Sequence, residues 1–241
     1  MATDTSPLTP QSQQVSPWRG LIDVFVSPGA LFTRLRDRPH WLIPLLALCI
    51  VMVAQQYVLY PFTQRAMLGS INDQMPAAMA QAYREGAHKP FGVMNAISPL
   101  FGVAIFMLLG AGILTGLAAM FTGKGGFKAL FASLAYAKLI TIPALVLSAL
   151  VVYLRGLDSV NSMVDIMWTI GPAIFIGENK LLFNIFSQIN LFEIWYLIVL
   201  VIAVRKVTGN NGAGATAAVV IYWLLGAVTQ IVTLAFTMGL K

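Results

Sequence analysis

Glu193 and Lys138 are the two charged residues of this sequence that lie at or inside apolar runs. Glu193 opens a stretch that is apolar from Ile194 to Val204, and Lys138 lies within the apolar run 129–153. A charge buried in hydrocarbon is costly, so it is a candidate for handling protons, ions or substrates. Two uncharged residues, Asn190 and Gln230, complete our set of candidate intramembrane polar residues.

Each of the two charges also has a purely structural explanation. The positive end of the helix dipole stabilises an acid in the first turn of a helix, so Glu193 is expected at the membrane interface. A lysine near a helix end can extend its ammonium to the interface. Because the third and fourth spans run antiparallel, with both residues toward the starts of their spans, we expect Lys138 and Glu193 near opposite faces. This disfavours an ion pair between them.

Other reactive groups are few. The chain has one cysteine, Cys49, which cannot form an intrachain disulfide, and two well-separated histidines. It contains neither an HExxH nor a GxSxG motif. We therefore predict a protein that is not an enzyme, with no metal site and no cofactor.

The composition predicts what must position these residues. Of 241 residues, 58% are hydrophobic and only 10% are charged, with a mean hydropathy of +0.79. A soluble domain carries about a quarter charged residues. We predict an all-α, polytopic transmembrane helical bundle. The net charge of +6 does not indicate nucleic acid, because the basic residues flank apolar runs and fit lipid headgroups.

Five apolar runs are long enough to cross a bilayer. They lie at residues 41–60, 99–121, 129–153, 190–207 and 215–236, within a membrane domain over residues 41–241. Residues 164–176 are apolar but too short to span, and both a re-entrant and an interfacial arrangement stay open. Four arginines precede the first span, so the positive-inside rule predicts a cytosolic N-terminus and an external C-terminus.

The N-terminal region divides into two parts. Residues 1–17 are polar without Lys or Arg, which predicts a disordered cytosolic tail. Residues 18–40 predict an interfacial amphipathic helix that begins at Ser27-Pro28 and ends at Pro39. Its arginines are candidates for binding anionic lipid headgroups: Arg34, Arg36 and Arg38. A cytosolic helix packed under the bundle is the alternative.

The second span carries a small-xxx-small pair, Gly112 and Gly116. Such a pair lets two membrane helices approach closely. We assign these glycines as a candidate helix-packing face.

Several short motifs appear in the order seen in a known family. They are Ser27-Pro28 with Phe32 and Leu35, Arg38-Pro39-His40-Trp41 with Leu42 and Pro44, Gly125-Gly126-Phe127, Ala135-Tyr136 with Pro143, and Asn190-X-Phe192-X-X-Trp195. On these residues the chain resembles a bacterial member of the Ypt-interacting-protein (Yip) family of five-span membrane proteins, over roughly Ile22 to Phe236. It departs from that pattern at Asn190, where the family has an acid, and at Glu193, where it has a small polar residue. Pro143 also follows Tyr136 at a wider interval, with Lys138 between them.

The resemblance implies architecture more than activity. Eukaryotic relatives are similar to trafficking adaptors that bind small GTPases and coat components, and no catalytic residues carry over. We expect a scaffold or accessory subunit of the bacterial cytoplasmic (inner) membrane that binds another membrane protein or itself. The alternative is a small transporter or lipid-handling protein that uses Glu193, Lys138 and the broken segment 164–176.

Overall fold

The computed structural model describes residues 17–72, 75–162, 165–166, 170–176, 180–210 and 212–237, and every regular element within them is helical. The helices are α1 (Gly20–Val26), α2 (Pro28–Asp37), α3 (Leu42–Gly69), α4 (Ala77–Ala87), α5 (Val93–Thr122), α6 (Phe127–Lys138), α7 (Ile142–Arg155), α8 (Lys180–Ser187), α9 (Leu191–Thr208) and α10 (Ala213–Thr237). Short 3₁₀ turns occupy Pro17–Arg19, Leu139–Thr141, Leu157–Ser159 and Pro172–Phe175. The predicted all-α class is confirmed. The predicted tail lies outside the described residues except for Pro17.

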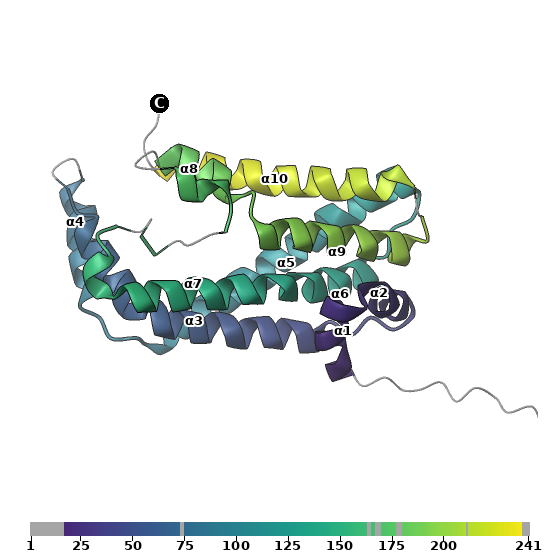
Figure 1. The fold of residues 1–241 in the computed structure, drawn as a ribbon, viewed down its shortest axis with the longest axis horizontal. Helices are drawn as coiled ribbons and strands as arrows, with labels where there is room; N and C mark the ends of the chain where they lie inside the picture. The colour runs from purple at the N-terminus through teal and green to yellow at the C-terminus, as the bar shows by residue number, and fades with distance from the viewer. Residues whose placement is uncertain are drawn as a thin grey trace, which may run out of the picture.

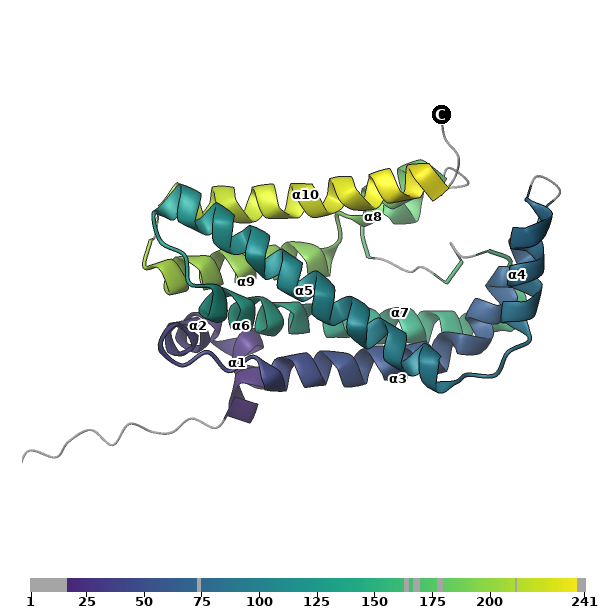
Figure 2. The ribbon, with the colours of Figure 1, turned by 180° about the vertical axis from the view of Figure 1, so that it is seen from behind.

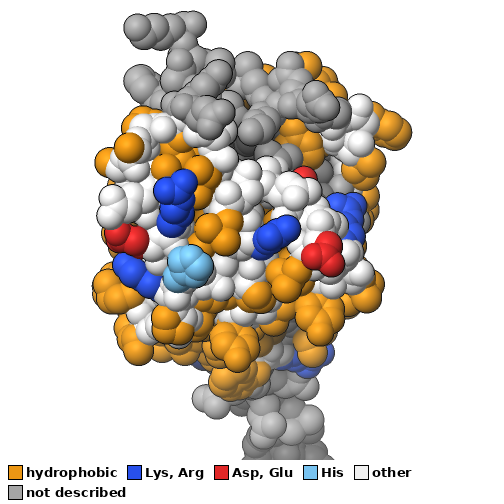
Figure 3. Space-filling model, turned by 90° about the vertical axis from the view of Figure 1, so that its left-hand side faces the viewer, with side chains coloured by type: hydrophobic (Ala, Val, Ile, Leu, Met, Phe, Trp, Pro, Cys, Tyr) orange, Lys and Arg blue, Asp and Glu red, His pale blue; other side chains and the backbone are white. Residues whose placement is uncertain are grey.

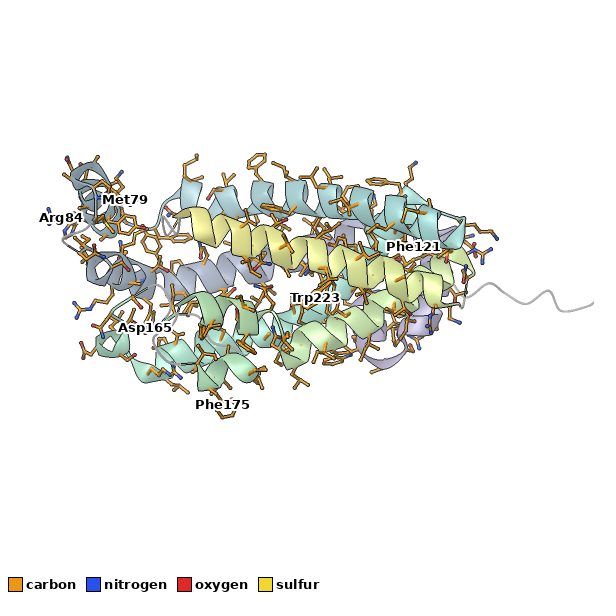
Figure 4. All side chains as sticks on the ribbon, turned by 90° about the horizontal axis from the view of Figure 1, so that it is seen from above. Met79, Arg84, Phe121, Asp165, Phe175 and Trp223 are labelled. Atoms are coloured by element: carbon orange, nitrogen blue, oxygen red, sulfur yellow. The ribbon has the colours of Figure 1, made fainter. Side chains whose placement is uncertain are left out.

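The long helices run side by side along the longest axis of the molecule (Figure 1). Seen from behind, α5 crosses the near face diagonally, over α3, α6, α9 and α10 (Figure 2). Helices α1 and α2 lie across the bundle axis at one end, which we call the N-terminal end (Figure 1). Helix α4 lies at the opposite end, the α4 end, where Figure 4 labels Met79 and Arg84, far from Phe121.

Among the described residues, four helical segments are long and apolar enough to cross a membrane. They are Leu42–Gly69, Val93–Thr122, Phe127–Arg155 and Ala213–Val232. Helix α9 matches the predicted fourth span in position, but its 18 residues include Glu193, Arg205 and Lys206. A crossing by α9, and with it the count of five spans, therefore remains a prediction.

Helix α3 extends eight residues past Pro61, where we expected the first span to end. A proline inside a helix removes one backbone hydrogen bond, and packing can offset that loss. Here Leu59, Phe62 and Ala66 are buried against Val152 and Val160, at the end of the third span and just after it. This small second core stabilises the extension.

The predicted third span is one apolar run but two helices. Helix α6 ends at Lys138, the 3₁₀ turn Leu139–Thr141 follows, and α7 carries Pro143 in its first turn. Because Pro143 has no N–H to donate, the α-helical ladder is interrupted there.

Helix α6 forms the centre of the core. Every residue from Ala129 to Ala137 is buried, and α1, α2, α3, α5 and α9 all pack against it. Membrane helices that are buried all round use small residues to bring backbones close, and α6 has alanine at four of these nine positions.

Charge is distributed unevenly between the two ends. Among the described residues, the N-terminal end holds eight cations, Arg19, Arg34, Arg36, Arg38, Lys124, Lys128, Arg205 and Lys206, with the acids Asp23 and Asp37. The α4 end holds four cations, Arg65, Arg84, Lys89 and Arg155, with three acids, Glu85, Asp158 and Asp165. Figure 3 views the α4 end, where both signs and a histidine are mixed.

Candidate functional site

Helix α9 begins inside the bundle rather than at one of its ends. The backbone N–H of Leu191 donates to the carbonyl of Ile170 (3.1 Å). Gly171 packs so closely on the backbone of Ile189 and Asn190 that a side chain there would clash. The short segment 170–176 therefore holds the start of α9 in place.

The first two turns of α9 bring polar side chains together from three helices. The Lys138 ammonium, at the end of α6, lies 4.0 Å from the centre of the Tyr196 ring. Tyr196 is 1% exposed, and its buried hydroxyl has no hydrogen-bond partner among the described residues. Tyr222 of α10 packs against the same core. We call Lys138, Glu193, Tyr196 and Tyr222 the polar layer.

Lys138, Tyr196 and Tyr222 lie at similar depths in the bundle, and Glu193 lies about one helical turn farther from the N-terminal end. At a rise of about 1.5 Å per residue, Lys138 lies about 17 Å from Phe127, Tyr196 about 18 Å from Thr208 and Tyr222 about 14 Å from Ala213. These three reference residues all lie at helix ends at the N-terminal end of the bundle (Figure 1). The layer therefore crosses the interior of the bundle.

Glu193 belongs to this layer and not to an end of the bundle. It lies in the first turn of α9, about one turn before Tyr196, whose ring the Lys138 ammonium contacts. The expectation that Lys138 and Glu193 lie near opposite faces is wrong, because α9 starts at the depth where α6 ends. The two do not form an ion pair: both ion pairs found in the described residues involve Asp23.

The other two candidate polar residues have structural partners. Asn190 caps α9: its side-chain oxygen accepts from the Glu193 N–H (2.9 Å), and its amide donates to the Ser187 carbonyl (3.1 Å). Gln230 accepts a hydrogen bond from Gln188 (2.9 Å), which links α10 to the end of α8. Neither contact places these residues in the polar layer.

A partly buried ion pair fixes the N-terminal helices. Arg34 of α2 pairs with Asp23 of α1, whose side chain is 8% exposed, and Arg19 lies 3.7 Å from the same carboxylate. Leu31, Phe32 and Leu35 of α2 are buried in the main core, and α2 packs along α9 and α6. The apolar face of α2 is therefore packed against the bundle, as in the alternative prediction for this helix.

The three candidate headgroup arginines therefore differ. Arg34 is engaged by Asp23, whereas Arg36 and Arg38 are exposed at the surface of the N-terminal end. Contact of Arg36 and Arg38 with lipid headgroups stays a prediction.

The two candidate packing glycines face outward. Gly112 and Gly116 are exposed, and a Cβ at either position would meet no atom within 4 Å. Gly110 faces inward instead, where a Cβ would lie 2.8 Å from the Tyr222 hydroxyl. Gly110 packs against its own chain, but it is not part of the small-xxx-small pair, Gly112 and Gly116.

Two features were missed in the sequence. One is the Asp23–Arg34 pair, since an 11-residue separation across a helix break gives no periodic signal. The other is the run Trp18, Ile22 and Val26, whose spacing of four predicts a single helical face. That face is exposed, at 64%, 64% and 72% respectively.

The polar layer places a lysine, a carboxylic acid and two tyrosines inside the bundle. Among the described residues, no three His, Cys, Asp or Glu side chains gather as metal ligands would. A helical bundle in which four of the described segments are long and apolar enough to cross a membrane is typical of an integral membrane protein. The chain belongs to the Yip1 family: the Yip1 domain model matches residues 22–234. Comparisons with curated proteins and with solved structures gave no match.

Proposed function

We propose that this Yip1-family protein is a non-catalytic membrane scaffold or accessory subunit that binds another membrane protein or itself. The observation that carries the proposal is the outward face of α5 around Gly112 and Gly116. The helix buries its opposite face on the bundle, so this face is available within the membrane.

The α5 face is a continuous exposed strip with a depression at its centre. Its members are Ile105 (54% exposed), Leu109 (60%), Gly112, Gly116 and Met120 (70%). They recur at intervals of three or four residues, which places them on one side of the helix. Large side chains flank the two glycines, so a partner helix can approach the α5 backbone between Leu109 and Met120.

The physics of the bilayer favours this use of the glycines. Lipid tails are as apolar as the helix surface, so membrane helices associate through close packing rather than through the hydrophobic effect. Glycines that face no part of their own chain gain nothing from intramolecular packing. Because these glycines have no side chain, the backbone of another helix can approach α5 closely at these positions.

The orientation and location follow as part of the proposal. We infer that the N-terminal end lies in the cytosol, since eight of the described cations gather there with only two acids. The C-terminus is then external, with α9 as a fourth crossing. The resemblance of the sequence to bacterial family members supports the cytoplasmic membrane of a bacterium.

A purification in mild detergent tests the scaffold. The parent protein should copurify with a second membrane protein or as an oligomer. Replacing both glycines, Gly112→Leu with Gly116→Leu, should remove that species while leaving thermal unfolding unchanged. Gly226→Leu is the matched control, since Gly226 is an exposed glycine on α10 with no atom within 4 Å of its Cβ position. Loss of the complex in the control as well would contradict an α5-specific interface.

The polar layer favours a second candidate function, the handling of a lipid or a small solute. Lys138 and Glu193 place a basic and an acidic side chain near the start of α9, and no ion pair joins them among the described residues. Such a pair can bind a group that carries a complementary charge. Mass spectrometry of lipids that copurify with the parent and with Glu193→Gln tests it. Identical lipid profiles would remove the support for lipid binding at this site.

A further inference from the structure

We propose that α1 and the 3₁₀ turn Pro17–Arg19 before it form a binding surface for the anionic membrane interface, in which Trp18, Ile22 and Val26 enter the lipid and neighbouring arginines bind phosphate groups. This goes beyond the scaffold function, because it concerns a different element and a different partner. We call the three apolar residues the α1 stripe.

The α1 stripe is exposed because the other side of α1 is locked onto the bundle. Asp23 is 5% exposed and Val24 is fully buried. Gly20 packs on the Tyr136 ring, with no room for a side chain between them. Phe25 meets Trp195 of α9 edge to face, with ring centres 5.7 Å apart. These contacts fix which way α1 faces, and they leave Ile22 and Val26 outside, with Trp18 exposed in the 3₁₀ turn just before α1.

The depth of α1 indicates that lipid covers the stripe. Helix α1 packs against α6 at Tyr136 and against the 3₁₀ turn Leu139–Thr141. Both lie within the third membrane-crossing segment, Phe127–Arg155, and not beyond its end. On α9, the flanking residues Ile194 and Ile198 are also exposed, at 48% and 55%. A surface at this level of the bundle faces the bilayer.

The charged residues at the N-terminal end of the bundle indicate which kind of lipid the α1 stripe meets. Arg19 has a side chain that is 68% exposed, and Arg36 and Arg38 are exposed as well. Asp37 is the exposed acid of the same region. A helix that lies across the bundle axis (Figure 1) with an apolar stripe and adjacent arginines matches the interface of a bilayer that contains anionic lipids. Tryptophan is enriched at membrane–water interfaces.

Depth-dependent fluorescence on the full-length protein tests the proposal. A Cys49→Ser protein with Ile22→Cys is labelled with an environment-sensitive fluorophore and reconstituted in phosphatidylcholine vesicles, with or without phosphatidylglycerol. The matched control is Lys124→Cys, in the exposed turn between α5 and α6. Both proteins must retain the thermal unfolding of their parent.

We expect a nitroxide lipid that carries its spin label near the headgroup to quench the Ile22 label severalfold more than the Lys124 label. Replacing Arg19, Arg36 and Arg38 with Gln should reduce the quenching in vesicles with phosphatidylglycerol and leave it unchanged in phosphatidylcholine alone. Equal quenching at both positions, with equal access to aqueous iodide, would overturn lipid insertion. Quenching that stays the same after the arginine substitutions would overturn the proposed selectivity for anionic lipid. An Ile22 label that is shielded from both quenchers only in native membranes would assign the stripe to a protein partner instead.

Discussion

The Lys138 ammonium lies over the face of the Tyr196 ring, 4.0 Å from its centre, and this contact ties the end of α6 to the second turn of α9. A cation over an aromatic face contributes about 0.5 to 2 kcal/mol, more where water is excluded. Tyr196 is almost fully buried and lies one turn after Glu193. The contact therefore gives a lysine inside an apolar run a partner within its own chain.

A double-mutant cycle measures this contact. Lys138→Met and Tyr196→Leu should each lower the thermal stability in detergent, and the pair should be less than additive by about 0.5 to 2 kcal/mol. Lys128→Met, on the exposed start of α6, is the control for loss of a lysine. Additivity of the two changes would mean that the cation and the ring do not stabilise each other.

Substitution of Gly110 gives a second test of the polar layer, at Tyr222. A Cβ at this position would lie 2.8 Å from the Tyr222 hydroxyl, while the next ring atom is 3.6 Å away. Overpacking of this kind costs about 1 to 3 kcal/mol. Gly110→Ala should therefore destabilise the protein, and Tyr222→Phe should relieve most of the loss, as measured by thermal unfolding. Gly112→Ala is the control, since nothing lies near its Cβ position. If Gly110→Ala were as well tolerated as Gly112→Ala, the packing of α5 on α10 would differ from the one described.

Much of the helical pattern could be predicted from the sequence, because apolar runs and prolines are local signals. The predicted runs 190–207 and 215–236 differ from α9 and α10 by one or two residues at each end. Ser27-Pro28 begins α2 as expected, although the Ser27 side chain makes no capping hydrogen bond.

The depth of the polar residues could not be predicted. Treating α9 as a full span placed Glu193 at an interface, whereas segment 170–176 brings the start of α9 inside the bundle. Contacts between helices that are far apart in sequence, such as Lys138 with Tyr196, depend on the order of helices around the bundle. No local periodicity carries that information.

The Asp23–Arg34 pair should decide whether α1 stays on the bundle. Removing one partner of a buried ion pair leaves an uncompensated charge and costs about 3 to 5 kcal/mol when both groups are buried. Arg34 is 38% exposed, so a smaller loss is expected here. Asp23→Ala should speed tryptic cleavage in α2, read by mass spectrometry, far more than Arg19→Gln does. The charge exchange Asp23→Arg with Arg34→Asp should restore part of the protection at Arg36, a cleavage site that all of these variants keep. Cleavage rates that match the parent would show that other contacts suffice to hold α1.

Labelling from outside the cell tests the orientation. In a Cys49→Ser background, an impermeant thiol reagent should label Gln81→Cys on α4 in intact cells. It should label Lys124→Cys only after the membrane is opened, because the cation-rich end is expected in the cytosol. Both positions are exposed, so burial does not explain a difference between them. The reverse pattern would invert the proposed topology.

Crosslinking in native membranes tests the scaffold proposal most directly. Single cysteines at Gly112, Gly116 and Gly226 in the Cys49→Ser protein are treated with a short thiol-to-thiol reagent, or with a thiol-reactive photocrosslinker that captures partners lacking cysteine. The proposal predicts a discrete higher-mass species from the two α5 positions and none from Gly226, which is exposed on α10. Only monomer from Gly112 and Gly116, or the same products from all three positions, would contradict an interface on α5.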